Sequence, residues 1–564
     1  LLLFIMLKSI NIYESISEYE AGYDNRTKKS LNVIREKNSK KRMFDAHVKS
    51  GFITFTAEEA GSTIGLAKLS TYQLLEYTTD NVFKPSPVWK KMDVNTVITL
   101  VNAGDMVHFR GMLSGNNTYD NYTQFTMTGK IAAKGNCNAL WNYNNLNAPL
   151  KVYCGYYMFS GCTSLTTAPE LPATTLASYC YRYMFSGCTS LTQAPELPAT
   201  TLASECYYYM FSGCTSLTTA PVLPVTTLAW GCYNGMFQGC TSLTQAPELP
   251  ATTLTYYCYS SMFYGCTSLT IAPELPATTL AGMCYEGMFS GCISLTITPE
   301  LPATTLAEQC YWYMFKGCTS LVQAPELPAT TLADWCYYEM FYGCTSLTQA
   351  PELPATTLAS NCYHSMFFNC TGLTTAPSIL PATTLAQSCY YYMFYGCTSL
   401  TQEPELPATT LSEYCYCCMF QGCTSLTQAP ELPATTLAES CYIGMFSGCS
   451  NLKYIKCLAT DISATNCTKG WVNSVSPTGT FVKVEGVEWE TGNSGIPTGW
   501  EVEEEYVPYV TFIAEEAGST IGLANLSSYQ TLQYKTSSSD WTSMSETTNI
   551  TLDNIGDKVY VRGI

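Results

Sequence analysis

Residues 180–203 read Cys-Tyr-Arg-Tyr-Met-Phe-Ser-Gly-Cys-Thr-Ser-Leu-Thr-Gln-Ala-Pro-Glu-Leu-Pro-Ala-Thr-Thr-Leu-Ala, and the same pattern begins again at Cys206. The step between units is 26 residues, with a single step of 27 where Pro377-Ser378-Ile379-Leu380 holds one extra residue. The first cysteine of each unit stands at 154, 180, 206, 232, 258, 284, 310, 336, 362, 389, 415 and 441. A fixed period of this length is the sequence signature of a stacked repeat protein, so these twelve units predict a solenoid.

Within one unit, the spacing of the apolar residues predicts a short helix followed by a short strand. Cys180, Met184 and Cys188 are four residues apart, which places them on one face of a helix. Gly187 would end this helix, and Leu191 begins an inward-facing strand. Because one unit cannot bury such a face alone, neighbouring units must stack. The expected fold class is therefore a right-handed α/β solenoid of short parallel strands and short helices.

A second duplication flanks the array. The decapeptide Ala-Glu-Glu-Ala-Gly-Ser-Thr-Ile-Gly-Leu at 57–66 recurs at 514–523, and Thr/Val/Tyr-rich alternation nearby is typical of β-strands. Both flanks are therefore expected to be small all-β modules. We divide the chain into a basic, polar segment with a missing start at 1–50, a β-module at 51–134, the solenoid with its caps at 135–476, a C-terminal cap and linker at 477–506, and a partial second β-module at 507–564.

The charge of the chain excludes two classes of partner. The formal net charge is −17, whereas nucleic acids and anionic membrane surfaces require a basic patch. No stretch reaches the ~20 apolar residues that cross a bilayer. The apolar residues 1–7 read as the end of a signal peptide or as a truncated start. We expect no nucleic-acid partner and no transmembrane segment.

The 29 cysteines invite a disulfide or metal interpretation. Two columns, at the first cysteine of each unit and eight residues later, contain 24 of them, and equivalent side chains in a stack point the same way, which is poor geometry for disulfides. Free cysteine packs as a small hydrophobe, so we expect buried, unbridged thiols. Cys415, Cys417 and Cys418 form one isolated cluster, which we read as a drifted repeat.

The sequence predicts no enzyme, no cofactor and no metal site. Catalytic hydrolysis needs a base near a nucleophile, but His47, His108 and His364 are the only histidines, and His364 stands at a varying repeat position expected on the surface. One glutamate position recurs down the stack, which suggests either a calcium column or a solvated acidic ridge. The ridge is favoured, because each unit offers one carboxylate and calcium needs six to eight oxygens. These residues are Glu170, Glu196, Glu248, Glu274, Glu300, Glu326, Glu352, Glu405 and Glu431.

The consensus carries a family resemblance. The segment Met-Phe-Ser-Gly-Cys-Thr-Ser-Leu-Thr-Thr-Ala-Pro-Val-Leu-Pro at 210–224 resembles the BspA-like leucine-rich repeats of bacterial surface proteins. The unit is longer than usual in that family, and Ala-Pro replaces a bulky aliphatic residue. The resemblance implies a leucine-rich-repeat solenoid, secreted or surface-exposed, that adheres to host proteins or other bacteria. Similar arrays also occur in bacteriophage-encoded proteins.

Positions that change between units are rich in tyrosine and tryptophan. They lie just before each first cysteine and just after the tyrosine that follows it, and their composition is that of antibody-like contact surfaces. The alternative is that these rings lie flat on one another as a stacking ladder between units. The candidate ligand-binding residues are Tyr183, Tyr209, Trp230, Tyr257, Trp312, Tyr313, Trp335, Tyr338, Tyr392 and Tyr414.

Together these features predict a non-catalytic, adhesin-like repeat protein. We expect it to lie outside the cell or on a bacterial cell surface and to bind an extracellular protein or glycan. Two alternatives remain at this point: a receptor-binding protein of a bacteriophage virion, and a purely structural spacer between β-modules.

Overall fold

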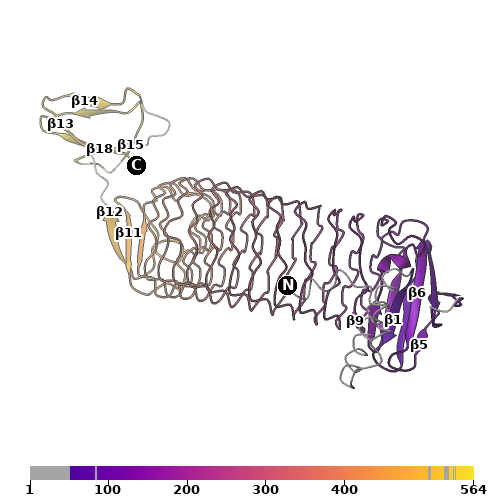
Figure 1. The fold of residues 1–564 in the computed structure, drawn as a ribbon. Helices are drawn as coiled ribbons and strands as arrows, with labels where there is room; N and C mark the ends of the chain where they lie inside the picture. The colour runs from indigo at the N-terminus through magenta and orange to yellow at the C-terminus, as the bar shows by residue number, and fades with distance from the viewer. Residues whose placement is uncertain are drawn as a thin grey trace, which may run out of the picture.

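A stack of coils lies between two β-modules in the computed structural model, which describes residues 51–82, 86–505, 510–525, 532–537, 539 and 542–563 (Figure 1). The basic segment at 1–50, including His47, lies outside the described residues. Within the described part of the chain, no helix has the length and apolar character needed to cross a membrane.

The N-terminal module consists of two sheets that share one core. Their strand orders are β4-β3-β6-β1-β8-β9 and β5-β2-β7. The rings of Phe55, Phe109 and Phe125 lie 5.4–5.6 Å apart between these sheets, so they join the two layers. The strands are β1 (Ile53–Ala57), β2 (Ser62–Lys68), β3 (Gln73–Thr78), β4 (Lys90–Lys91), β5 (Ile98–Leu100), β6 (Met106–Leu113), β7 (Gln124–Thr128), β8 (Ile131–Lys134) and β9 (Leu165–Thr167).

This module also closes the first end of the stack. Strand β9 belongs to the first coil and pairs in parallel with β8 of the module. The ring of Phe125 stacks on Phe159 of the same coil at 5.3 Å. A short 3-10 helix, η1 (Cys137–Leu140), is buried between them. The hydrophobic core therefore runs from the module into the solenoid without a break.

The prediction of a short helix in each unit is wrong. Residues 178–187 form consecutive turns, because Tyr179, Tyr183 and Gly187, four residues apart, are left-handed with φ of 60°, 55° and 75°. In this unit Tyr181 is left-handed as well, with φ 58°. A left-handed residue interrupts the i→i−4 hydrogen bonds of an α-helix. The Met184 N–H instead donates to the Tyr181 carbonyl three residues back, and the Gly187 N–H donates to Ser212 of the next coil.

Short parallel pairings join the coils elsewhere, as the sequence predicts. Most of them are single bridges one repeat apart, such as Gln193 with Thr219 and Thr305 with Thr331. The prolines that follow cannot donate to a ladder, which limits each pairing to about one residue. The leucine-rich-repeat part of the prediction holds, while the α/β description does not.

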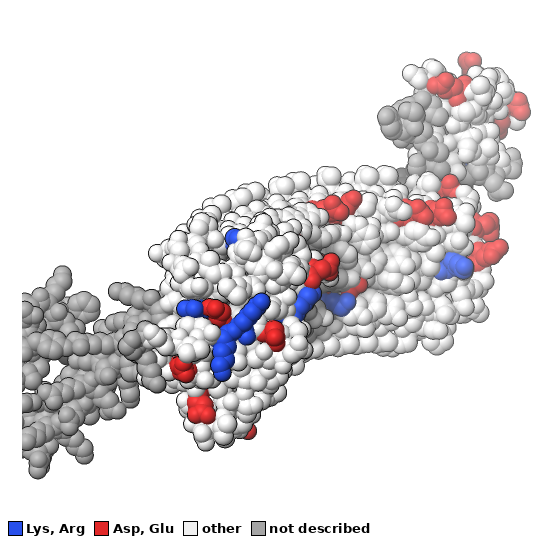
Figure 2. Space-filling view, turned by 90° about the vertical axis from the view of Figure 1, so that its right-hand side faces the viewer, with Lys and Arg blue, Asp and Glu red and all other residues white. Residues whose placement is uncertain are grey.

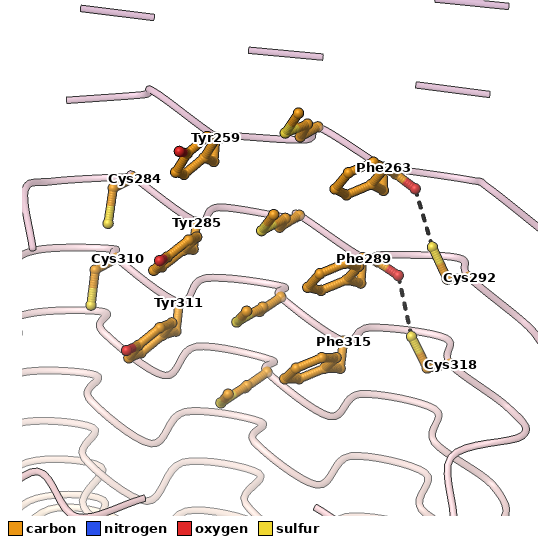
Figure 3. Close-up of a cluster of buried hydrophobic side chains, with 14 of the residues drawn as sticks. Tyr259, Phe263, Cys284, Tyr285, Phe289, Cys292, Cys310, Tyr311, Phe315 and Cys318 are labelled. Carbon is orange, nitrogen blue, oxygen red and sulfur yellow. Dashed lines mark hydrogen bonds between the residues drawn. The ribbon is translucent and has the colours of Figure 1, made fainter. Parts of the chain in front are cut away.

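Identical side chains form ladders through the core (Figure 3). Phe289 lies 5.7 Å from both Phe263 and Phe315, and all three are fully buried. A parallel ladder of tyrosines includes Tyr285 and its neighbours. The thiol of Cys318 donates to the Phe289 carbonyl at 3.2 Å. All 29 cysteines are buried and unpaired in this structure, so the predicted burial of both columns is confirmed.

The other end of the stack is closed by Trp471 and a three-stranded sheet. Trp471 stands where the units have Met-Phe, and its ring stacks on Tyr442 at 6.0 Å, so it ends the tyrosine ladder. The sheet pairs β10, β11 and β12 in parallel. These strands are β10 (Tyr454–Cys457), β11 (Thr480–Val484) and β12 (Glu501–Glu505).

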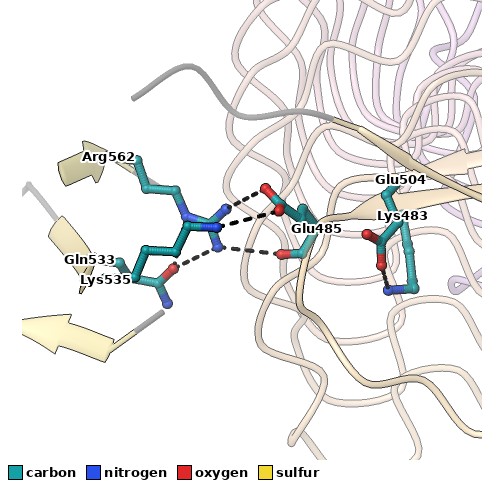
Figure 4. Close-up of polar contacts among 6 residues, drawn as sticks. All are labelled: Lys483, Glu485, Glu504, Gln533, Lys535 and Arg562. Carbon is teal, nitrogen blue, oxygen red and sulfur yellow. Dashed lines mark hydrogen bonds and ion pairs between the residues drawn. The ribbon is translucent and has the colours of Figure 1, made fainter. Parts of the chain in front are cut away.

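The second module has its own small core, and two of its basic residues contact Glu485 of the cap. Arg562 donates through Nη2 to the Glu485 carbonyl at 3.3 Å, and Lys535 lies 3.7 Å from the Glu485 carboxylate (Figure 4). Its sheets have the orders β13-β18-β15-β16 and β14-β17. The strands are β13 (Val510–Ile513), β14 (Ser519–Gly522), β15 (Leu532–Thr536), β16 (Thr542–Met544), β17 (Asn549–Leu552) and β18 (Lys558–Gly563).

Candidate functional site

The ten candidate residues lie on the turn side of the coils, and we call their rings the aromatic band. The left-handed conformation of the second varying residue, as at Tyr313 with φ 59°, sets adjacent side chains side by side instead of on opposite faces. Trp312 and Tyr313 therefore contact each other at 5.1 Å. Trp230 is 44% exposed, whereas the other nine residues are half-buried. The band is thus a fixed surface with ring edges open to solvent.

The densest part of this band is a cluster of five rings from four consecutive units, in which His364 and Tyr391 join three of the candidate residues. Trp335 lies 6.3 Å from Trp312 and 5.1 Å from Tyr338. His364 continues the cluster at 4.6 Å from Tyr338 and 4.7 Å from Tyr391. His364 was expected on the surface, but it is half-buried here, and burial lowers the pKa of its imidazole to about 4. The ring is therefore neutral at physiological pH and acts as an aromatic member of the cluster.

Other parts of the band form the stacking ladder that was the alternative reading. Tyr183 stacks on Tyr157 at 4.6 Å with an angle of 13° between the rings, and contacts Tyr209 at 5.4 Å. The guanidinium group of Arg182 lies 4.2 Å from the Tyr208 ring centroid. These rings contact the next coil as well as solvent. The same band can therefore present a surface to a ligand and stabilise the stacking of neighbouring coils.

A second surface carries the glutamate column. Eight of the nine glutamates are exposed and Glu170 is half-buried, in agreement with an acidic ridge. Shallow hollows of about 510 and 630 Å³ lie side by side along it, between residues 296–302 and 323–328 and between 322–328 and 348–354. Ile297 and Val322 at these hollows are 55% and 54% exposed.

These hollows, and the two exposed aliphatic residues at them, were not predicted from the sequence. Their signal in the sequence is that Ile297 stands where most units have glutamine or threonine. Figure 2 shows that much of the visible solenoid surface carries no charged side chain, which makes such apolar replacements prominent.

The described residues offer little for metal or acid–base chemistry. Nowhere in the described ranges do three His, Cys, Asp or Glu side chains gather closely enough to hold a metal ion. His108 is buried in β6, where its Nδ1 lies 2.8 Å from Thr54 Oγ1. No candidate catalytic pair therefore emerges from the histidines that the structure describes.

The fold defines a solenoid repeat protein in which leucine-containing coils stack in parallel. Residues 136–270, 233–348, 259–400 and 364–467 match the family described as the BspA type leucine rich repeat region, in six copies. The chain belongs to this family, as its consensus segment suggested.

Two solved structures are similar to this chain. A leucine-rich repeat protein from Bacteroides ovatus is 21% identical, with 63% of this chain and 88% of that chain covered and a TM-score of 0.37. A leucine rich cell surface protein from Faecalibacterium prausnitzii is 19% identical, with 60% and 91% covered and a TM-score of 0.30. The search of curated proteins gave no match.

Proposed function

We propose that this chain is a non-catalytic binding protein of the bacterial cell surface, which holds an extracellular protein or glycan on its aromatic band. The main support for this proposal is a cluster of five rings from four consecutive units: Trp312, Trp335, Tyr338, His364 and Tyr391. Rings held by their neighbours lose little conformational entropy when a ligand binds, and aromatic side chains dominate binding energy at interfaces. The membership of the BspA-type family supports the surface location.

The test replaces Trp312, Tyr313, Trp335 and Tyr338 together with serine. The full chain and the variant are screened against extracellular proteins and a glycan array, and thermal melting of both is recorded. Lost binding with an unchanged melting temperature supports the proposal. A matched variant, Ile297→Thr with Val322→Thr, changes the hollows along the acidic ridge instead and should retain binding.

A structural spacer is the second candidate, and the flat stacking of Tyr153 on Tyr179 at 4.6 Å and 8° favours it. In a spacer the rings only join neighbouring coils. The serine variant would then melt at a lower temperature, while any ligand found in the screen would still bind. The same two measurements therefore separate the candidates.

A further inference from the structure

Five of the 29 cysteines lie outside the two columns, and two of these five, Cys417 and Cys418, are adjacent in the chain. Cys417 and Cys418 occupy the two varying positions of the unit that begins at Cys415, where the preceding unit has Tyr391 and Tyr392. They therefore lie in line with the aromatic band and not in the core columns. Cys418 is 7% exposed, more than any other cysteine, whereas Cys415 is fully buried.

The coil backbone holds these two thiols together. Cys418 is left-handed, with φ 54°, as is the second varying residue of the other units. In the preceding unit this conformation brings the rings of Tyr391 and Tyr392 to 4.2 Å. In this unit it brings the two Sγ atoms to 3.6 Å. The contact between the two thiols follows from a backbone conformation that the other units repeat at this position.

The surroundings distinguish Cys418 from the column cysteines. The hydrogen bond between the Cys417 and Cys418 thiols lowers the pKa of Cys418, and the Tyr392 hydroxyl acts in the same direction, against the effect of burial. Burial raises the pKa of Cys415 to about 12. On the side of the next unit stands Gly444, which has no side chain; a Cβ there would lie 2.9 Å from the Cys418 sulfur.

We propose that Cys417 and Cys418 form a redox-active vicinal dithiol that small disulfides oxidise to a reversible Cys417–Cys418 disulfide. The Cys418 thiolate attacks one sulfur of the reagent and forms a mixed disulfide, and the first leaving thiolate takes the proton that Cys418 has lost. Cys417 then attacks the Cys418 sulfur. This step closes the internal S–S bond and releases the second reagent thiol with the proton from Cys417. Two electrons pass from the protein to the reagent.

The product is expected to be readily reduced again. Adjacent Cα atoms are ~3.8 Å apart, whereas ordinary disulfides join Cα atoms at roughly 4.4–6.8 Å. The bond between neighbouring residues is therefore strained, and strained disulfides are the labile ones. Added thiol should return the oxidised chain to the dithiol state without unfolding it.

The experiment treats the reduced, native full chain with an aromatic disulfide that releases a coloured thiol. We expect two equivalents of coloured thiol per chain, no retained adduct, and an intact mass lower by two hydrogens. Peptide mapping should place the new bond between Cys417 and Cys418. After denaturation, the reduced chain should show its 29 thiols and the oxidised chain two fewer.

Single variants separate the two roles. Cys417→Ser should release one equivalent and keep the reagent bound at Cys418, because no second thiol can displace it. Cys418→Ser should react at least about tenfold more slowly, because the more exposed of the two thiols is lost. Cys415→Ala is the matched control and should behave like the unmodified chain. The proposal is overturned if no native thiol reacts, if each cysteine keeps a separate adduct, or if the double serine variant still releases two equivalents.

Discussion

Phe315 is fully buried between Phe289 and Phe341, with ring centroids 5.7 and 5.6 Å away. Its replacement by alanine should reduce local stability by ~3–5 kcal/mol, because replacing a buried phenylalanine by alanine typically costs this much. Each coil contacts only its neighbours, so amide hydrogen exchange should accelerate mainly within residues 284–362. Half-buried Phe368 is the matched control, and its replacement by alanine should cost less. Uniform acceleration along the whole array would contradict one-dimensional stacking.

The buried thiols give the array a predictable response to alkali. Burial raises the pKa of Cys214, Cys266 and Cys344 to about 12, above the ordinary value of 9.0. Between these values the unfolded chain has lost protons that the folded chain retains, so stability falls as pH rises. The slope is ~1.4 kcal/mol per pH unit for each thiol that unfolds. With reductant present, the urea midpoint should therefore drop steeply from pH 9 to pH 11, and a midpoint constant over this interval would refute the linkage.

The repeated turn sets the rules for substitution within one coil. Gly343 is left-handed with φ 71°, and no atom lies within 4 Å of the position that a Cβ would occupy. Asn369 holds the equivalent position with φ 56°. Gly343→Asn should therefore change the free energy of unfolding by less than ~1 kcal/mol, whereas Gly343→Val should cost roughly 1–2 kcal/mol or more. Urea unfolding measures both, and equal effects of the two changes would contradict a left-handed turn.

The same turn explains why the element was misread from the sequence. A turn repeated every four residues and an α-helix both place residues i and i+4 on one face, so the spacing of Cys180, Met184 and Cys188 does not separate them. The distinguishing signal is glycine. Gly231, Gly235 and Gly239 are spaced four apart within one unit and all have positive φ. Three glycines in nine residues are poor helix formers, and this argues for turns. The repeat itself, its stacking and its buried residues follow directly from the period.

The candidate site was predictable in composition and location on the unit but not in its contacts. Comparing units identifies the varying positions, because scaffold residues stay constant. It does not show that Trp312, Trp335 and Tyr338 contact one another, since this depends on the left-handed residues between them. For the same reason the sequence alone does not show that His364 is half-buried or that the thiols of Cys417 and Cys418 contact each other.

At the scale of the molecule, the two β-modules use equivalent arginines differently. Arg110 pairs with Glu76 of its own sheet at 2.8 Å. In the second module Gln533 replaces the corresponding carboxylate. Arg562 donates to Gln533 Oε1 and also lies 3.7 Å from the carboxylate of Glu485 in the solenoid cap. The two arginines thus differ in their ionic partner, which lies within the module for Arg110 and in the solenoid cap for Arg562.

This contact predicts a change in shape on removal of one charge. Glu485→Gln should weaken the docking of the second module, because Arg562 and Lys535 lose their shared carboxylate. Small-angle X-ray scattering should then give an altered maximum dimension at low salt. Glu504→Gln breaks only the Lys483 pair within the cap and is the control. Identical scattering from Glu485→Gln and the unmodified chain would show that other contacts hold the module.

The stacking of near-identical coils has a consequence for how such a chain changes over time. Every coil offers the next one the same ladder rings and the same N–H donors, so excision of a whole unit rejoins two surfaces that already match. Removing residues 284–309, one whole unit, should leave a shorter, cooperatively folded chain by circular dichroism. Removing residues 284–296, half a unit, would place the turn segment of one coil beside the bridge segment of the next and should cause aggregation. Recombination within the gene can therefore change the length of the solenoid in steps of 26 residues, without any change in the modules at its ends.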